Sequence, residues 1–334
     1  MLLIARAPVR ISFAGGGTDF PAYFRKYGGQ VLSATLNRYV YTMLSPAPRA
    51  AHLISANYSL FQQYAPDRDA LWDGNLSLPR AILEAFGNPG GIDLFIAAQV
   101  PPGTGLGSSG SLAVSMIAAL AAWSGWSLTR YEIAELACQI EIERMGLPVG
   151  KQDQYAAAFG GLNRIRFEAS GVFVERVPLA LEVRQALERR LRLFYTGQAR
   201  PSATILKTQQ QATTEEDPQV LRRLHLLKAL AEDMEDCLTM GDLDGFGRLL
   251  HEAWILKRGL ASAISNDFID RCYAAAREAG AIGGKITGAG GGGFLLLYCP
   301  EEAIERVTEV MAAMGLKPMD VAFEAQGVQV FRIE

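Results

Sequence analysis

The chain has 334 residues, 49% of them hydrophobic and 20% charged, which is enough apolar material for one large domain or two ordinary ones. Its formal net charge is -3 and its basic residues are scattered, which argues against nucleic acid or an anionic membrane as a partner. The four cysteines and three histidines lie far apart, which argues against a zinc site and a Ser-His-Asp triad.

The apolar segments indicate a protein without membrane spans. The longest of them, around residues 112–126, is interrupted by Ser115, Ser124 and Gly125 and is too short to cross a bilayer. The first residues, MLLIARAPVRISF, lack the features of a signal peptide. The dispersed cysteines fit a reduced compartment. We therefore expect a soluble, cytoplasmic protein, either a monomer or a homodimer.

The first hundred residues alternate between strand patterns and glycine-rich turns. Val9, Ile11 and Phe13 alternate with Arg10 and Ser12, which predicts a half-buried strand. The elements expected after it are a short helix between Thr18 and Gly28, a strand at 30–44 and a strand at 92–100.

The remainder of the chain is mostly helical. A helix is expected to begin at Ser109, a second to run from the capping box at Thr129 and Glu132 to Arg144, and a short third to cover Gln154–Phe159. Further helices are expected from Pro218 and near 243–256, 267–279 and 301–314, with a strand at 294–298. The polar segment 207–217, KTQQQATTEED, is predicted to be a loop or linker.

The segment 101–111, PPGTGLGSSGS, contains the pattern G-x-G-x-x-G and has two interpretations. A dinucleotide site would require a second strand with an acidic residue about 20 positions further on, but two helices follow instead. A phosphate-binding loop fits better, because glycines allow close approach and Ser108 or Ser109 adds a hydroxyl at the start of a helix. A glycine-rich turn with a serine cap remains the purely structural alternative.

Two carboxylates follow this loop in the sequence and are candidates for phosphoryl-transfer chemistry. Glu143 could ligate magnesium, and Asp153 could act as a base or orient the acceptor hydroxyl. Each also has a structural interpretation, Glu143 as a solvated residue of a last helical turn and Asp153 as a helix cap. The glycine-rich run between Lys285 and Phe294 joins two apolar segments, which predicts a fixed loop rather than a flexible linker.

Three glycine-rich segments in this order, near residues 15, 105 and 290, resemble the three motifs of the GHMP kinases, and PPGTGLGSSGS is very similar to their phosphate-loop motif. ARAPVRISFAGGGTDF, GKQDQYAAAFGGLN, FYTGQARPSATIL and KITGAGGGGFLLLY resemble the D-glycero-D-manno-heptose 7-phosphate kinase branch. The resemblance implies a two-domain α/β (α+β) fold. Residues 1–190 would form an ATP-binding domain like ribosomal protein S5 domain 2, and residues 191–334 a ferredoxin-like domain.

The resemblance also implies roles for individual residues. The loop Pro102, Gly103, Thr104, Gly105, Leu106, Gly107, Ser108 and Ser109 would bind ATP. Ser109 and Glu143 would hold Mg²⁺, while Asp153 and Arg10 would be catalytic. Substrate contacts would come from Gly16, Gly17, Thr18, Asp19, Lys151, Arg200 and Gly290, with Arg200 the preferred cation for the sugar phosphate and Lys207 a further candidate.

One position departs from the galactokinases, which read G-E-H-T-D where this chain has Gly15-Gly16-Gly17-Thr18-Asp19. The departure argues against galactose and leaves more room for an acceptor. The resemblance implies transfer of the ATP γ-phosphoryl group to the anomeric hydroxyl of heptose 7-phosphate, for nucleotide-heptose and surface glycan synthesis. The alternatives are another GHMP sugar kinase such as a fucokinase, an NAD-dependent dehydrogenase, and a nucleotide sensor without catalysis.

Overall fold

Two β-sheets organise the chain in the computed structural model, which describes residues 1–47, 51–55, 60–64, 76–198 and 202–334. The larger sheet has the strand order β12-β1-β2-β5-β3-β4, with β6 and β7 added beside β2, and the smaller has the order β11-β8-β10-β9. The smaller sheet contains β8 (Leu191–Tyr195), β9 (Gly283–Ile286), β10 (Phe294–Tyr298) and β11 (Lys317–Met319). The larger sheet contains β1 (Leu2–Ala14), β2 (Gly29–Pro46), β3 (Ala51–Ser55), β4 (Leu60–Tyr64), β5 (Ile92–Ala98), β6 (Leu162–Glu168), β7 (Gly171–Arg176) and β12 (Gln329–Ile333).

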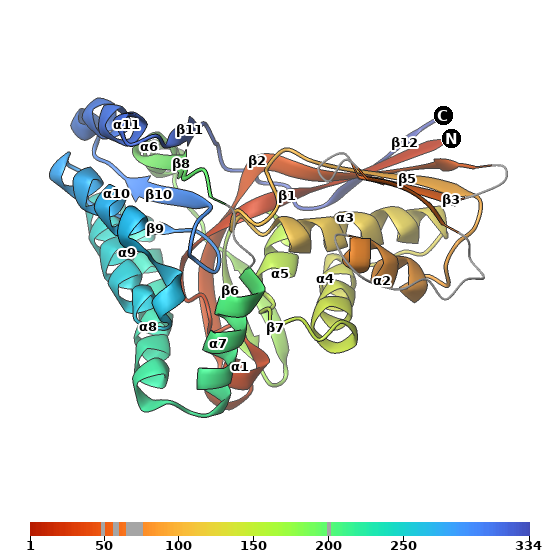
Figure 1. The fold of residues 1–334 in the computed structure, drawn as a ribbon, viewed down its shortest axis with the longest axis horizontal. Coiled ribbons are helices and arrows are strands. Elements are labelled where there is room, and N and C mark those ends of the chain that lie inside the picture. The colour runs from red at the N-terminus through yellow and green to blue at the C-terminus, as the bar shows by residue number, and fades with distance from the viewer. Residues whose placement is uncertain (48–50, 56–59, 65–75, 199–201) are drawn as a thin grey trace.

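Helices cover both sheets and give the molecule two lobes (Figure 1). The helices before residue 160 are α1 (Pro21–Tyr27), α2 (Ser77–Ala85), α3 (Ser108–Trp123), α4 (Arg130–Cys138) and α5 (Gln152–Phe159). All of them except α1 belong to the first lobe, the one that contains β3 and β5. The others are α6 (Leu181–Arg190), α7 (Ser202–Thr214), α8 (Pro218–Met240), α9 (Leu243–Arg258), α10 (Asp267–Glu278) and α11 (Ile304–Ala313). Among the described residues, no helix is both long and apolar enough to cross a bilayer.

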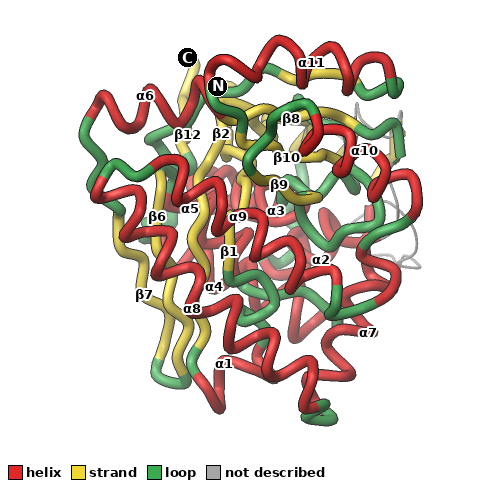
Figure 2. The backbone as a smooth tube through the Cα atoms, turned by 90° about the vertical axis from the view of Figure 1, so that its left-hand side faces the viewer, coloured by secondary structure: helices red, strands yellow, loops and turns green. Residues whose placement is uncertain are grey.

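The long strands β1 and β2 belong to both lobes. Residues 40–46 of β2 pair with β5, whereas residues 29–34 pair with β6. Helices α3 and α5 contact β1 from the first lobe, and α8 and α9 contact it from the second, so that Figure 2 shows α8 and α9 in front of these strands. The expectation of a half-buried first strand is therefore wrong: Arg10 and Ser12 are as buried as the apolar residues between them, because helices cover both faces.

The pairing of β1 with β2 shifts register between Pro8 and Arg10. Proline has no backbone N–H to contribute to a ladder, so an irregularity at this point is expected. Beyond the shift, the backbone N–H of Arg10 donates to the carbonyl of Leu106 at 2.9 Å instead. The shift thereby brings the Arg10 segment against the glycine-rich loop at 101–107.

The last strand returns to the first lobe. β12 pairs antiparallel with β1, from Leu2 opposite Ile333 to Arg6 opposite Gln329. The expected boundary near residue 190 falls where α6 ends and β8 begins. The last strand of the predicted 191–334 domain, β12, belongs to the larger sheet.

The polar segment 207–217 is not a linker, contrary to our expectation. Most of it lies in α7, and Asp217 caps the next helix by accepting hydrogen bonds from the amides of Gln219 and Val220. Ile205, Gln209 and Thr213 are buried and lie four residues apart, so they form one helical stripe facing the protein. Polar composition concealed this helix because two of the three buried positions are polar.

Candidate active site

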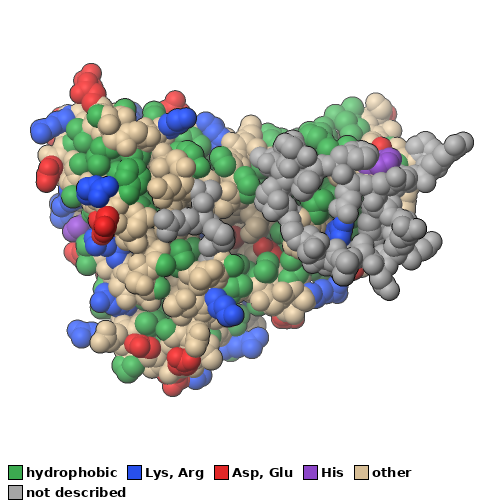
Figure 3. Space-filling model, in the orientation of Figure 1, with side chains coloured by type: hydrophobic (Ala, Val, Ile, Leu, Met, Phe, Trp, Pro, Cys, Tyr) green, Lys and Arg blue, Asp and Glu red, His purple; other side chains and the backbone are tan. Residues whose placement is uncertain are grey.

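The loop at 101–107 joins β5 to α3 and presents the amino end of that helix to a pocket between the lobes. Figure 3 shows that face of the molecule, which is hollowed between the two lobes. Gly103, Gly105 and Gly107 have φ of 73°, 81° and 75°, a conformation that glycine adopts without strain. The first amides of a helix have no partners within it and point along a favourable dipole. The loop is therefore suited to bind an anion such as phosphate.

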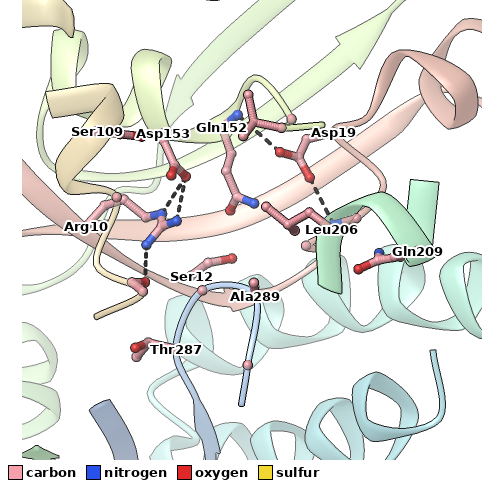
Figure 4. A pocket seen from close by; sticks show the side chains of 18 of the residues that line it. Arg10, Ser12, Asp19, Ser109, Gln152, Asp153, Leu206, Gln209, Thr287 and Ala289 are labelled. Carbon is pink, nitrogen blue, oxygen red and sulfur yellow. Dashed lines mark hydrogen bonds and ion pairs between the residues drawn. The ribbon is translucent and has the colours of Figure 1, made fainter. Parts of the chain in front are cut away.

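Arg10 and Asp153 meet beside this loop. Arg10 Nε and Nη2 lie 2.8 Å and 2.6 Å from Asp153 Oδ1, and Arg10 Nη1 donates to the carbonyl of Gly105 at 2.7 Å (Figure 4). Both contacts to the carboxylate end on Oδ1, so Oδ2 has no hydrogen bond within the described part of the chain. Asp153 lines the pocket and its side chain is 24% exposed. An oxygen is therefore available there to accept a proton or a hydrogen bond from a bound hydroxyl.

Ser109 and Glu141 form a second polar contact at the amino end of α3. Ser109 Oγ donates to Glu141 Oε1 at 3.1 Å, and Gln154 Nε2 donates to Glu141 Oε2 at 2.6 Å. Glu141 lies in a π-helical turn, Gln139–Arg144, that continues α4. It is completely buried, and burial raises the pKa of its carboxyl to about 7. A buried carboxylate with a hydroxyl beside it offers two hard oxygen atoms to a cation.

The sequence assigned this position to Glu143, and the structure does not place Glu143 there. Its side chain is exposed and does not line the pocket. Glu141 is on the inner face of the helix, seven residues after Ala134 and four after Ala137, both buried. Two residues further on, the helix has turned by roughly half a circle, which directs Glu143 to solvent. A carboxylate at an apolar-stripe position is the sequence signal that could have identified Glu141.

Asp19 marks the other end of the pocket. Its Oδ1 accepts from the amide of Gly17 at 2.9 Å and its Oδ2 from the amide of Gln152 at 3.2 Å. The residue is 2% exposed, and burial raises the pKa of its carboxyl. Gly16 and Gly17 also line the pocket. The first glycine-rich segment and α5 therefore hold one carboxylate between them.

The third glycine-rich segment packs directly on the phosphate loop. A Cβ at Gly288 would lie 2.3 Å from the Cα of Gly105, and Thr287 Oγ1 donates to the carbonyl of Thr104 at 3.1 Å. Gly290 and Gly292 line the pocket, as expected for a fixed loop. The two loops therefore form one wall, with backbone against backbone.

Two buried lysines lie behind this wall, and the sequence analysis identified neither as functional. Lys257 Nζ donates to the carbonyl of Gly288, and burial lowers its pKa to about 8. Lys285 Nζ donates to the carbonyls of Ser12 and Phe13 at 2.8 Å and 3.0 Å, which ties β9 to β1. Of the two, only Lys257 lines the pocket. Its position on the buried face of α9 was the available signal.

Comparison with known proteins identifies the family. Residues 76–161 match the N-terminal domain of GHMP kinases, and residues 226–316 match their C-terminal domain. A D-glycero-alpha-D-manno-heptose 7-phosphate kinase of Campylobacter jejuni is 32% identical over 336 aligned positions, which cover 98% of each chain. The chain belongs to the GHMP kinases.

This GHMP kinase is also similar to two further proteins, one a sugar-phosphate kinase and the other a bifunctional sugar kinase. The crystal structure of a D-glycero-D-manno-heptose 1-phosphate kinase from Bacteroides thetaiotaomicron superposes with a TM-score of 0.82 at 26% identity, covering 99% of both chains. The bifunctional fucokinase/GDP-fucose pyrophosphorylase of Arabidopsis thaliana is 28% identical over 88% of this chain and 29% of its own length.

Family membership confirms the expected α/β GHMP kinase fold and the expected enzyme class, a phosphotransferase that uses ATP and acts on an alcohol group. The dehydrogenase alternative is wrong. In the GHMP kinase, α3 after the glycine-rich loop is followed by α4 and not by a parallel strand, and β5 before it pairs antiparallel with β2.

Several residues assigned from the sequence do not face the pocket of the GHMP kinase. Lys151 Nζ is paired with Glu135 at 2.7 Å and 2.9 Å, so its charge is already compensated. Thr18, a buried residue, donates to the carbonyls of Gly15 and Gln30 and thus shapes the turn. Lys207 is exposed on α7. Arg200 lies outside the described residues.

Within the phosphate loop, the residues divide between lining and support. Gly103, Gly105, Gly107, Ser108 and Ser109 line the pocket between the lobes. By contrast, Leu106 is fully buried in the core, and Thr104 Oγ1 donates to the carbonyl of Pro101 at 2.8 Å. These two residues hold the loop in shape rather than contact a ligand through their side chains.

A second, mostly apolar cavity adjoins the loop on its other side. It has a volume of about 300 Å³ and shares Gly103, Ser108 and Ser109 with the pocket between the lobes. Its other lining residues include Val40, Leu78, Ile96, Pro102, Leu112 and Met145. The sequence does not predict this cavity, because its walls come from strands and helices that are distant in the chain.

Proposed function

We propose that this GHMP kinase transfers the γ-phosphoryl group of ATP to the anomeric hydroxyl of D-glycero-D-manno-heptose 7-phosphate, giving the 1,7-bisphosphate. The name of the C. jejuni relative, which aligns over nearly the whole chain, supports the choice of acceptor. The structural observation that carries the proposal is the Arg10–Asp153 pair. It lies between the phosphate loop and a polar pocket that ends at Asp19.

In this proposal ATP lies across the loop. Its purine ring occupies the apolar cavity, where the flat aromatic surface of the ring is buried away from water. Its phosphates reach the amides at the start of α3 through the residues that both cavities share. The γ-phosphoryl group then faces the pocket between the lobes, on the side of Arg10.

The acceptor hydroxyl oxygen forms a bond to the γ-phosphorus while the bond from that phosphorus to the β,γ-bridging oxygen breaks, and ADP leaves. Asp153 Oδ2 either takes the hydroxyl proton or orients the hydroxyl by accepting its hydrogen bond. Arg10 and Lys257 supply positive charge beside the loop, in a buried setting where each favourable interaction is stronger than in water. Most of the catalytic effect would come from this positioning and neutralisation.

The donor set at Ser109 and Glu141 fits Mg²⁺. No group of three or more His, Cys, Asp or Glu side chains that could hold a metal exists among the described residues, so the protein would contribute few ligands. Magnesium typically takes one or two protein oxygens together with substrate phosphate oxygens and water. When bound, the ion would neutralise phosphate charge, while Ser109 and Glu141 would orient it.

A panel of acceptors with ATP tests the proposal. We expect phosphorylation of D-glycero-D-manno-heptose 7-phosphate and none of free fucose or galactose, measured by ADP release and by ³¹P NMR of the product. Heptose 1-phosphate belongs in the panel, because the two heptose kinase relatives differ in the phosphate named. Activity on fucose alone would establish the fucokinase alternative.

The substitution Asp153→Asn separates catalysis from nucleotide binding. Loss of a positioned proton acceptor should lower kcat by about 10²- to 10⁴-fold. The affinity for ATP should stay within a factor of two or three, because the loop amides do not change. Calorimetric titration with ATP and steady-state kinetics provide the two values. Unchanged phosphorylation in this variant would mean that Asp153 serves only as a residue of the first turn of α5.

A further inference from the structure

The pocket between the lobes contains polar atoms that no protein group satisfies. Ser12 Oγ, Gln152 Oε1 and Gln209 Nε2 are buried and have no hydrogen-bond partner among the described residues, and all three residues line this pocket. A buried polar atom without a partner costs roughly 1–3 kcal/mol, so proteins rarely keep several together. Their concentration in one pocket indicates that a ligand completes their hydrogen bonds.

These three residues come from separate elements and converge on one space. Ser12 is on β1, two positions after Arg10, Gln152 opens α5 immediately before Asp153, and Gln209 is on α7. Figure 4 shows the Gln152 side chain between Arg10 and Leu206, with Ser12 and Ala289 below it and Gln209 opposite. The space they surround is therefore adjacent to the Arg10–Asp153 pair, on the side of Asp19.

One glycine makes room for this arrangement. A Cβ at Gly17 would lie 2.1 Å from Gln209 Nε2, whereas a Cβ at Gly16 would lie at ordinary contact distance, 3.7 Å from Gln152 Nε2 and 3.8 Å from Ser12 Oγ. Gly17 has a φ of +99°, which also disfavours any side chain. The absence of side chains at this turn allows the amide of Gln209 to reach the pocket from the second lobe.

The chemistry of the three groups matches a polyhydroxylated ligand. A hydroxyl both donates and accepts, so it pairs with an amide nitrogen, an amide oxygen or another hydroxyl. Asp19 already accepts hydrogen bonds from two backbone amides, and burial raises the pKa of its carboxyl. A ligand hydroxyl that donates to this carboxyl is therefore favoured over a ligand group that brings a second negative charge beside it. A phosphate group would instead require cations, and the cations that line this pocket among the described residues, Arg10 and Lys257, are at the loop end.

We propose that Gln209, together with Gln152 and Ser12, forms the hydroxyl-binding cradle for the acceptor sugar, and that Gln209 is the specificity-determining residue contributed by the second lobe. The proposal deepens the proposed function and rests on it for the nature of the acceptor. Gln209 contacts substrate hydroxyls and not the transferred phosphoryl group. It therefore acts on acceptor affinity, and it requires α7 to be in place before the acceptor binds.

The substitution Gln209→Met tests the proposal, because methionine has the length of glutamine without its polar atoms. We expect the KM for D-glycero-D-manno-heptose 7-phosphate to rise by about 10- to 100-fold, the effect of losing one or two hydrogen bonds in a buried site. The KM for ATP should change less than twofold. Gln211→Leu is the matched control: Gln211 lies on the same helix, is exposed and donates a side-chain hydrogen bond to Glu215, so both constants should be unchanged.

Monodeoxy analogues of the sugar phosphate distinguish direct contact from a structural role. Removing the hydroxyl that Gln209 binds should weaken acceptor binding by the wild type and have no further effect on acceptor binding by Gln209→Met. The other analogues should weaken acceptor binding by both proteins equally. An unchanged KM in a folded variant, or equal effects for every analogue, would overturn the proposal. If Gln209→Met does not fold, Gln209→Ala is measured in the same way.

The wild-type measurements keep this proposal separate from the proposed function. If the wild type phosphorylates another sugar but not heptose 7-phosphate, the choice of acceptor fails, and the same variant series is run with that sugar and its monodeoxy forms. If the wild type phosphorylates no hydroxylated acceptor, the cradle has no ligand of the stated class and this inference fails as well.

Discussion

Glu141 combines complete burial with a carboxylate that faces the phosphate loop. Among the described residues two side chains donate to it, Ser109 and Gln154, and neither carries a charge. Burial therefore dominates and raises its pKa to about 7. A residue in this state gains much from a nearby cation, since a cation both stabilises the ionised form and lowers the pKa.

The pair Glu141→Gln and Glu143→Gln tests which carboxylate matters. Glu141→Gln should raise the Mg²⁺ concentration for half-maximal activity by about 10- to 100-fold, because a charged contact to the ion is lost. Glu143→Gln, two residues further along the same helix, should behave as the wild type because Glu143 is exposed. Titration of activity against free Mg²⁺ measures both. The reverse result would reinstate the assignment made from the sequence.

The raised pKa of Glu141 also predicts a pH dependence. Mg²⁺ requires the ionised carboxylate, so its apparent affinity should be about tenfold weaker at pH 6 than at pH 8. Without ligands, the stability of the fold changes with pH in the opposite direction to the Mg²⁺ affinity. The protonated carboxyl of Glu141 favours the folded state, and this contribution to stability is lost as the pH rises through 7. Thermal unfolding with and without Mg²⁺ at both pH values measures these effects. Glu141→Gln lacks the titrating group and corrects for the titration of ATP.

At the scale of elements, the two glycine-rich loops support each other. The segments near 105 and 288 touch backbone to backbone, and Arg10 Nη1 fixes the first of them through the carbonyl of Gly105. Because the amides proposed to bind phosphate belong to the first loop, their positions depend on the second. The site is thus built from loops of both lobes.

Gly288→Ala should disturb this wall. Its Cβ would meet the Cα of Gly105 at 2.3 Å, and φ of +64° adds strain. We expect the KM for ATP to rise by about tenfold or more, with a loss of roughly 1–3 kcal/mol in the free energy of unfolding. Gly125→Ala is the control, since Gly125 has φ of +74° and no atom within 4 Å. It should lose only about 1–2 kcal/mol of stability and keep its KM for ATP. Equal effects on KM would contradict the proposed loop contact.

At the scale of the whole molecule, the two lobes are joined through β1 and β2, whose residues contribute to both hydrophobic clusters formed by the described residues. Phe13 of β1 packs edge-on against Phe246 of α9 with ring centroids 5.1 Å apart, and the Lys285 ammonium spans from β9 to β1. β12 supplies the outer neighbour of β1 from the far end of the chain. Neither lobe therefore completes its own core.

We expect a fragment of residues 1–190 not to fold by itself, because β1 would lose β12 on its edge and α8 and α9 on one face. The full chain should unfold in a single transition. Urea denaturation, followed in parallel by far-ultraviolet circular dichroism and by tryptophan fluorescence, checks both statements. Two separated transitions, or a fragment with a cooperative transition of its own, would show that the lobes are independent.

The sequence identified features that are local in the chain. A helix after the loop at 101–107, a capping box at Thr129 and an aspartate at the start of α5 all depend on neighbouring residues, and the structure contains each of them. The phosphate-loop motif and the order of the three glycine-rich segments were sufficient for the family. Arg10 and Asp153, both assigned as catalytic from that resemblance, lie in contact.

Tertiary structure alone decided which polar side chains line the two cavities beside the phosphate loop. Glu141, Lys257 and Gln209 each lie on the buried stripe of a helix, where sequence patterns predict apolar residues. The groups that neighbouring segments bring near such a residue decide whether it is satisfied within the protein or contacts a ligand. Lys151 is satisfied within the protein, because Glu135 neutralises its charge. Local spacing determines the face of a helix on which a residue lies. Only the packing of distant segments determines what that face meets.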